Sequence, residues 1–170
     1  MRILIQPYYF WNGHYKNYTE SLIRSNSICI ISSSFKKSKN ILSVEPVIKN
    51  YEKNILNFTL SRILNCLLVI LQLRSFIFKK SYFHFLEFEP FSKIIFLTFN
   101  IFLRKKVIFT IHSTSVSKSN SSIIGFIKVI QRLLFIFAIL LSNFSPCKIV
   151  VHNNFNKKFL QLFTFSKRIF

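Results

Sequence analysis

Short apolar runs that alternate with longer amphipathic stretches constrain the fold of this chain more than any other feature. Five runs have the character of buried strands: Arg2–Gln6, 27–31, 81–88, 106–111 and Cys147–Val151. Apolar residues recur at helical spacing in five other stretches: 15–24, 54–74, 91–103, 123–142 and 153–163. Strands joined by helices need crossover connections, which produce parallel sheets. The sequence therefore predicts an α/β fold, a Rossmann-like parallel sheet with helices on both faces.

The length and the acidic residues limit the number of domains and the kinds of site. A chain of 170 residues suits one domain with a real core and is short for two. We therefore expect residues 1–170 to form a single domain. The acidic residues are only five, all of them Glu, and there is no Asp. This excludes an Asp-x-Asp metal clamp, and we expect neither a metal nor another cofactor.

The basic residues make polyanions the expected partners. Lys and Arg number 24, which gives a net charge of +19. Such a chain attracts nucleic acids, anionic lipid headgroups or phosphorylated substrates. The cations, however, form small scattered clusters, and no recognised nucleic-acid module is present. Among these partners we rank nucleic acid last. Part of the excess of Lys also has an explanation unrelated to function, because an AT-rich genome enriches Lys, Asn, Ile and Phe.

The cysteines and the apolar stretches indicate the cytoplasm. Cys29, Cys66 and Cys147 are odd in number and far apart, as is typical of buried thiols in a reducing compartment. A strand-like run follows Arg2 directly, without the features of a signal peptide. The most apolar stretch, 123–141, contains Lys128, Gln131 and Arg132. We therefore expect a buried or interfacial helix there instead of a clean membrane span.

Two polar features are expected at the carboxyl ends of strands, where open parallel sheets bind ligands. Gly13 and His14 end the first loop and open the first helix, where a glycine and free N–H groups favour an anion. Thr110 and His112 end another strand, and a histidine there can hydrogen-bond a sugar hydroxyl or a phosphate. The alternatives are a plain strand-to-helix turn and a structural histidine.

Four further polar residues are interpreted as weaker candidates for a site. Glu87 and Glu89 would lie on one side of a strand at the rim of the cleft, or form a solvated strand end. His84 alternates with phenylalanines and fits a hydrogen-bonded core position. His152 follows the last strand, immediately before a plausible helix start.

Several of these segments, taken in order, resemble the N-terminal domain of GT-B glycosyltransferases, specifically the family-4-like group. The similar segments are the strand and glycine loop over 2–14, the helix over 15–24, the strand ending in Thr110-Ile111-His112, and 147–153 with the following 156–160. Each motif is short, and their collinearity along most of the chain carries the resemblance.

The resemblance implies a retaining, metal-independent transfer from a nucleotide-sugar, with this domain receiving a lipid-linked or polysaccharide acceptor. Gly13 and His14 would lie near the donor phosphates, and His112 would be the catalytic contact to the transferred sugar. Thr110 and Glu89 would belong to the same cleft. The family's C-terminal domain, which holds the donor, has no counterpart here. We therefore expect a truncated or split enzyme that is inactive alone, peripheral on the inner face of an anionic membrane.

The alternative hypothesis is a catalytically inactive membrane-surface or scaffold protein that keeps the fold. It predicts vesicle binding that falls with salt, without any binding of sugar nucleotides.

Overall fold

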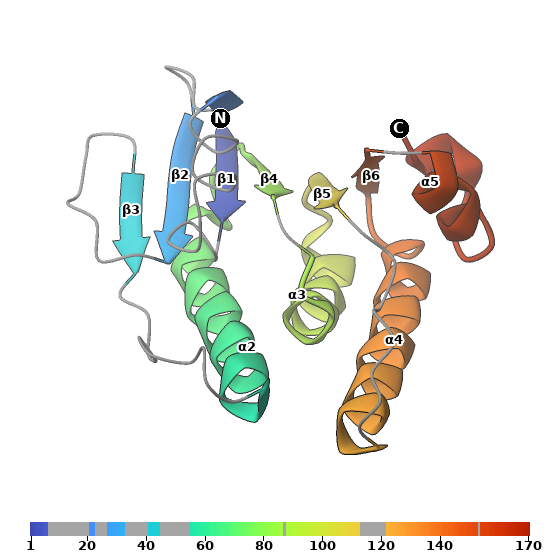
Figure 1. The fold of residues 1–170 in the computed structure, drawn as a ribbon. Coiled ribbons are helices and arrows are strands. Elements are labelled where there is room, and N and C mark those ends of the chain that lie inside the picture. The colour runs from blue at the N-terminus through green and yellow to red at the C-terminus, as the bar shows by residue number, and fades with distance from the viewer. Residues whose placement is uncertain are drawn as a thin grey trace.

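A single parallel sheet of six strands organises the computed structural model of the chain (Figure 1). The structure describes residues 1–6, 21–22, 27–32, 41–44, 55–86, 88–112, 122–152 and 154–170. The strand order is β3-β2-β1-β4-β5-β6, with every neighbouring pair parallel. The strands are β1 Arg2–Gln6, β2 Ser27–Ser32, β3 Ile41–Val44, β4 Tyr82–Phe85, β5 Val107–Ile111 and β6 Cys147–Val151. This doubly wound order confirms the predicted Rossmann-like α/β class.

The helices match the predicted stretches closely. They are α2 Ile55–Gln72, α3 Pro90–Leu103, α4 Ser122–Ser142 and α5 Asn154–Gln161. Figure 1 shows α2, α3 and α4 along the same side of the sheet, with α5 beyond β6. The helix predicted over 15–24 lies outside the described residues except for Ser21 and Leu22, which are helical.

Strand alternation divides the core between the two faces of the sheet. One face contributes the larger cluster, in which Ile3, Phe85 and Phe109 pack with buried side chains of α2, α3 and α4. The other face contributes a smaller cluster around Leu4, with Leu22 packed against it. Residues that are neighbours along a strand thus enter different clusters, as the period of two requires.

Two elements differ from the sequence-based prediction. Strand β3 was not predicted, because it is only four residues long. Its Leu42 is also exposed, so the segment lacks the apolar pattern of a buried strand. Strand β4 ends at Phe85 instead of residue 88. The chain turns there, and Glu89 precedes Pro90 at the first position of α3, a placement that suits proline.

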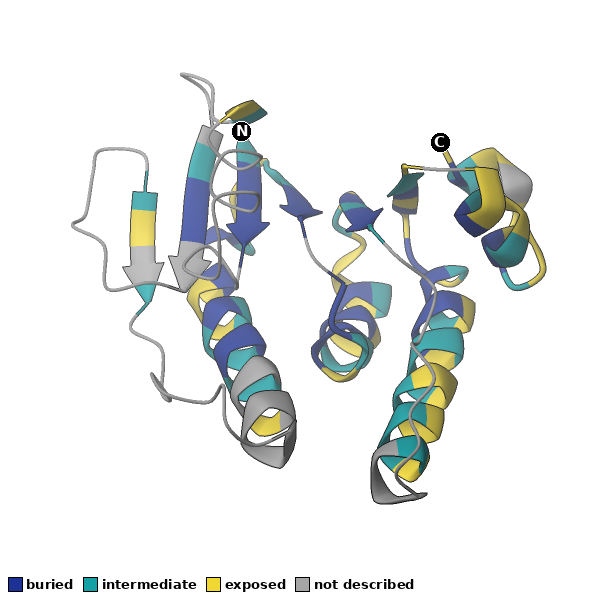
Figure 2. Ribbon diagram, in the orientation of Figure 1, coloured by how far each residue is buried: buried dark blue, intermediate teal, exposed yellow. Residues whose placement is uncertain are grey.

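From Phe126 to Leu140, helix α4 presents an apolar face to solvent, and exposed positions on α4 are yellow in Figure 2. Its other side packs against α3, and Ala138 and Ile139 enter the core. We define the α4 stripe as its exposed apolar side chains: Phe126, Val129, Ile130, Leu133, Phe137 and Leu140. The segment Gly125–Ser142 is long and apolar enough to cross a membrane. Among the residues that the structure describes, the segment packs against α3 on one side and leaves the α4 stripe exposed on the other.

Candidate functional site

His112 is fixed at the carboxyl end of β5 by contacts from three other segments. Its Nε2 lies 3.0 Å from the carbonyl oxygen of Leu86, after β4. Because a carbonyl only accepts, Nε2 carries the hydrogen and donates it. The ring stacks on that of His152, which follows β6, with centroids 4.8 Å apart and planes at 21°. Asn156 of α5 donates its amide hydrogen to the backbone oxygen of His112 over 3.3 Å.

This arrangement gives the carboxyl edge a half-exposed imidazole whose orientation is set by the protein. The loops after β4, β5 and β6 meet at the ring of His112. Parallel sheets of this order bind ligands outside this edge. The contact with His152 was not predicted. Because Ile111 is in register with Val151, the two histidines follow neighbouring strands at the same level, and that pairing could have revealed the contact.

Thr110 lies two residues before His112, but its hydroxyl is engaged inside the sheet. The side chain is fully buried, and its Oγ1 accepts a hydrogen bond from Nε2 of His84 over 2.9 Å. The guanidinium of Arg2 donates to Nδ1 of the same imidazole over 2.6 Å. This confirms the interpretation of His84 as a hydrogen-bonded core residue. It also gives Thr110 a partner inside the fold instead of one at the edge.

Glu89 is the N-cap of α3, so the interpretation of a solvated strand end is wrong. Its carboxylate accepts from the backbone N–H groups of Phe91 at 3.0 Å and Ser92 at 2.7 Å. The side chain is only 7% exposed. A carboxylate at this position satisfies N–H groups that lack partners within the helix and complements the helix dipole. Its described contacts stabilise α3 beside the candidate site.

Gly13 and His14, the predicted phosphate-side residues, lie outside the described residues. Their place at the carboxyl edge therefore remains a prediction from the sequence.

The three cysteines are buried and free, and the structure argues against a thiol nucleophile. Burial raises the pKa of the Cys29 thiol to about 12, and burial also raises the pKa of Cys147. Since the thiolate is the reactive form, these groups stay unreactive near neutral pH. Within the described ranges, no group of three or more His, Cys, Asp or Glu side chains is placed to hold a metal ion.

Comparison with known sequences adds no identification. No protein-family model and no curated protein matches this chain.

Proposed function

We propose that this domain is the acceptor side of a retaining, nucleotide-sugar-dependent glycosyltransferase, with His112 beside the transferred sugar. The observation that carries the proposal is the fixed imidazole at the carboxyl end of β5 in a doubly wound sheet. The segments that resemble the family occupy β1, β5, β6 and α5 in the same order. The donor nucleotide would be bound by a separate C-terminal domain.

His112 would act by positioning and by hydrogen bonding, without a metal. The Leu86 carbonyl holds Nε2, and the stacked ring of His152 restricts rotation of the imidazole. A polar group that is already oriented loses little freedom when the sugar arrives, so its interaction is available in the transition state.

The first prediction concerns turnover. We expect the chain alone to transfer no sugar, and the chain mixed with the donor-domain protein encoded beside it to be active. In that mixture, His112→Ala should lower kcat/KM by about tenfold or more, since it removes an oriented hydrogen-bonding group. The measurement is product formation from a panel of nucleotide-sugars, followed by mass spectrometry.

The matched control is His152→Phe, which keeps a stacked ring but removes the second imidazole, and it should change kcat/KM by less than about threefold. Turnover by the isolated chain would contradict the need for a second domain. Full activity of His112→Ala would contradict the role of the imidazole. Inactivity of every mixture would favour the inactive membrane-surface protein.

We also propose that the domain docks peripherally on an anionic membrane surface through the α4 stripe. Lys128 and Arg132 lie on the same helix, and the net charge of +19 favours anionic lipid. Each basic residue near such a surface contributes on the order of 1 kcal/mol. A second copy of the chain would meet the stripe with the same excess of positive charge, which disfavours self-association. Because Ala138 and Ile139 lie in the core, the helix would rest on the membrane without crossing it.

The second prediction tests this surface. Leu133→Glu should weaken binding to vesicles that contain phosphatidylglycerol by about tenfold or more, because an inserted leucine contributes about 1.5–3 kcal/mol. The control is Leu71→Glu on α2, since Leu71 is 62% exposed and Leu133 is 61% exposed. Binding is measured by vesicle sedimentation at two salt concentrations. Equal losses in both variants would show that the stripe has no special part in docking.

A further inference from the structure

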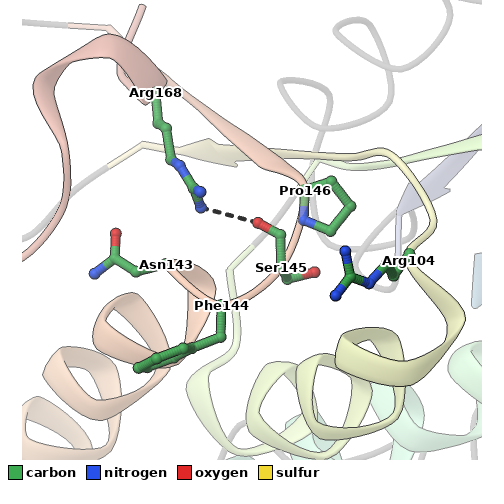
Figure 3. Close-up of a pocket in the computed structure, with 6 residues that line it drawn as sticks. All are labelled: Arg104, Asn143, Phe144, Ser145, Pro146 and Arg168. Atoms are coloured by element: carbon green, nitrogen blue, oxygen red, sulfur yellow. Dashed lines mark hydrogen bonds between the residues drawn. The ribbon is translucent and has the colours of Figure 1, made fainter.

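A pocket of about 380 Å³ opens at the amino ends of β5 and β6, the edge of the sheet opposite His112 (Figure 3). It lies where α3 and α4 both end and where the last turn of the chain returns to β6. The pocket is lined by Arg104, Asn143, Phe144, Ser145, Pro146 and Arg168. Two guanidinium groups therefore reach this opening from segments that are far apart in the sequence, as Figure 3 shows.

Buried and partly buried hydrogen bonds hold the walls of this pocket together. The amide of Asn100, which is fully buried on α3, donates to Ser145 Oγ over 2.6 Å and to the Lys105 carbonyl over 3.0 Å. Asn143 donates to the Phe163 carbonyl over 2.9 Å, and its side-chain oxygen accepts from Thr164. These bonds join the end of α3, the α4–β6 turn and the C-terminal segment. The walls of the pocket are therefore held in place without a ligand.

The two arginines differ in how the protein holds them. Arg168 is anchored, because its Nη1 donates to the carbonyls of Ser142 at 2.8 Å and Ser145 at 2.9 Å. Arg104 follows α3, and we find no hydrogen bond from its guanidinium to any described residue. Arg168 can therefore fix one side of an anion, and Arg104 can close on it from the other side.

The electrostatic balance at the pocket is positive. The C-termini of α3 and α4 each bring the equivalent of about −0.5 charge, whereas the two guanidiniums bring two full positive charges. No carboxylate lines the pocket. The one acidic residue that the structure describes, Glu89, caps the opposite end of α3. The helix ends therefore neutralise about half of the positive charge, and the remainder favours an anion.

The backbone of Arg104 supplies a second, independent observation. Its φ is 48°, in the left-handed region, at the position after α3 that glycine usually occupies. A residue with a Cβ costs roughly 1–2 kcal/mol in this conformation. The chain has an arginine at a position where glycine would be favoured for the backbone. That cost points to a use for the side chain.

We propose that this pocket binds a phosphate group between Arg104 and Arg168. Guanidinium forks match the geometry of phosphate oxygens, and Arg is the side chain best suited to this contact. Phe144 stands 73% exposed at the rim, where it suits an apolar neighbour of the phosphate. The group belongs to a soluble phosphomonoester or to a lipid headgroup. This site does not depend on the proposed sugar transfer, since it lies at the other edge of the sheet.

The third prediction uses Arg104→Gly, a change that removes the guanidinium and relieves the left-handed strain together. Titration of the whole chain with inorganic phosphate should show saturable binding that sodium chloride of equal ionic strength does not reproduce. Arg104→Gly should weaken phosphate binding by about tenfold or more, as loss of a charge-assisted hydrogen-bonding group implies. The Tm without ligand should stay the same or rise. Arg104→Gln should weaken phosphate binding similarly, without the change of backbone freedom.

The control is Lys80→Gln, which removes an exposed cation that does not line the pocket. It should leave the phosphate affinity within about twofold. Two probes distinguish a soluble phosphomonoester from a lipid headgroup. If the ligand is soluble, glycerol phosphate should show binding that depends on Arg104. If the ligand is a lipid, only phosphatidic acid vesicles should show such binding. Phosphate binding equal to that of chloride would overturn the proposal. So would unchanged affinity in Arg104→Gly, or an equal loss in Lys80→Gln.

Discussion

Replacing Phe85 by alanine is expected to lower the free energy of unfolding by about 3–5 kcal/mol, the range for a large aromatic side chain deleted from a packed core. Phe85 is completely buried on β4. Its ring lies 4.8 Å from that of Phe96 on α3 and 5.4 Å from that of Phe109 on β5. The Nζ of Lys93 lies 4.3 Å above the same ring. One substitution would therefore remove contacts that join the sheet to α3, and would leave a buried ammonium without its aromatic neighbour.

The measurement is urea denaturation followed by circular dichroism, with the slope of the transition compared between variants. The control is Phe78→Ala, because Phe78 is 96% exposed and its loss should change stability by less than about 0.5 kcal/mol. A loss in Phe85→Ala as small as that of the control would mean that the cluster around Phe85 does not stabilise the fold. An altered slope would show that the variant no longer unfolds from the same compact state.

The architecture could be predicted because its long elements carry a strong periodic signal. The stretches 54–74 and 123–142 each repeat apolar residues over several helical turns, and both became helices. The strand Cys147–Val151 was predicted with its observed bounds. The edge strand β3 was missed, because a run of only four residues carries too little pattern to separate a strand from a loop.

The candidate site could be predicted only in part, since side-chain direction depends on neighbours that the sequence does not name. His112 was predicted at the end of its strand and lies there. Thr110 was assigned to the same cleft, although its hydroxyl accepts a hydrogen bond from His84 on the neighbouring strand β4. Glu89 was assigned to a strand, whereas a proline at position 90 and a cap at Glu89 begin a helix instead. The pocket at Arg104 and Arg168 joins residues too distant in sequence for any local pattern to predict.

The second large effect is expected from acid. Burial, first, and the charge of Arg2, second, lower the pKa of His84 from 6.5 to about 4. The Arg2 guanidinium only donates, so Nδ1 of His84 must accept and the folded imidazole is neutral. Below pH 6.5 the unfolded chain takes up a proton that the folded chain refuses until about pH 4. Stability is therefore retained above pH 6.5 and lost as the pH falls toward 4, by on the order of 3 kcal/mol.

His84→Gln separates this effect from the general repulsion of a chain with a net charge of +19. A glutamine can accept from Arg2 and donate to Thr110, but it does not titrate. Free energies of unfolding should be measured for both proteins across the range from neutral pH to about pH 4. The repulsion destabilises both alike, so the difference between the two curves isolates His84. On acidification, the free energy of unfolding of His84→Gln should rise relative to that of the unsubstituted chain by on the order of 3 kcal/mol. Parallel curves would mean that folding does not lower the pKa of His84, which would contradict the effect of its burial and of the Arg2 charge.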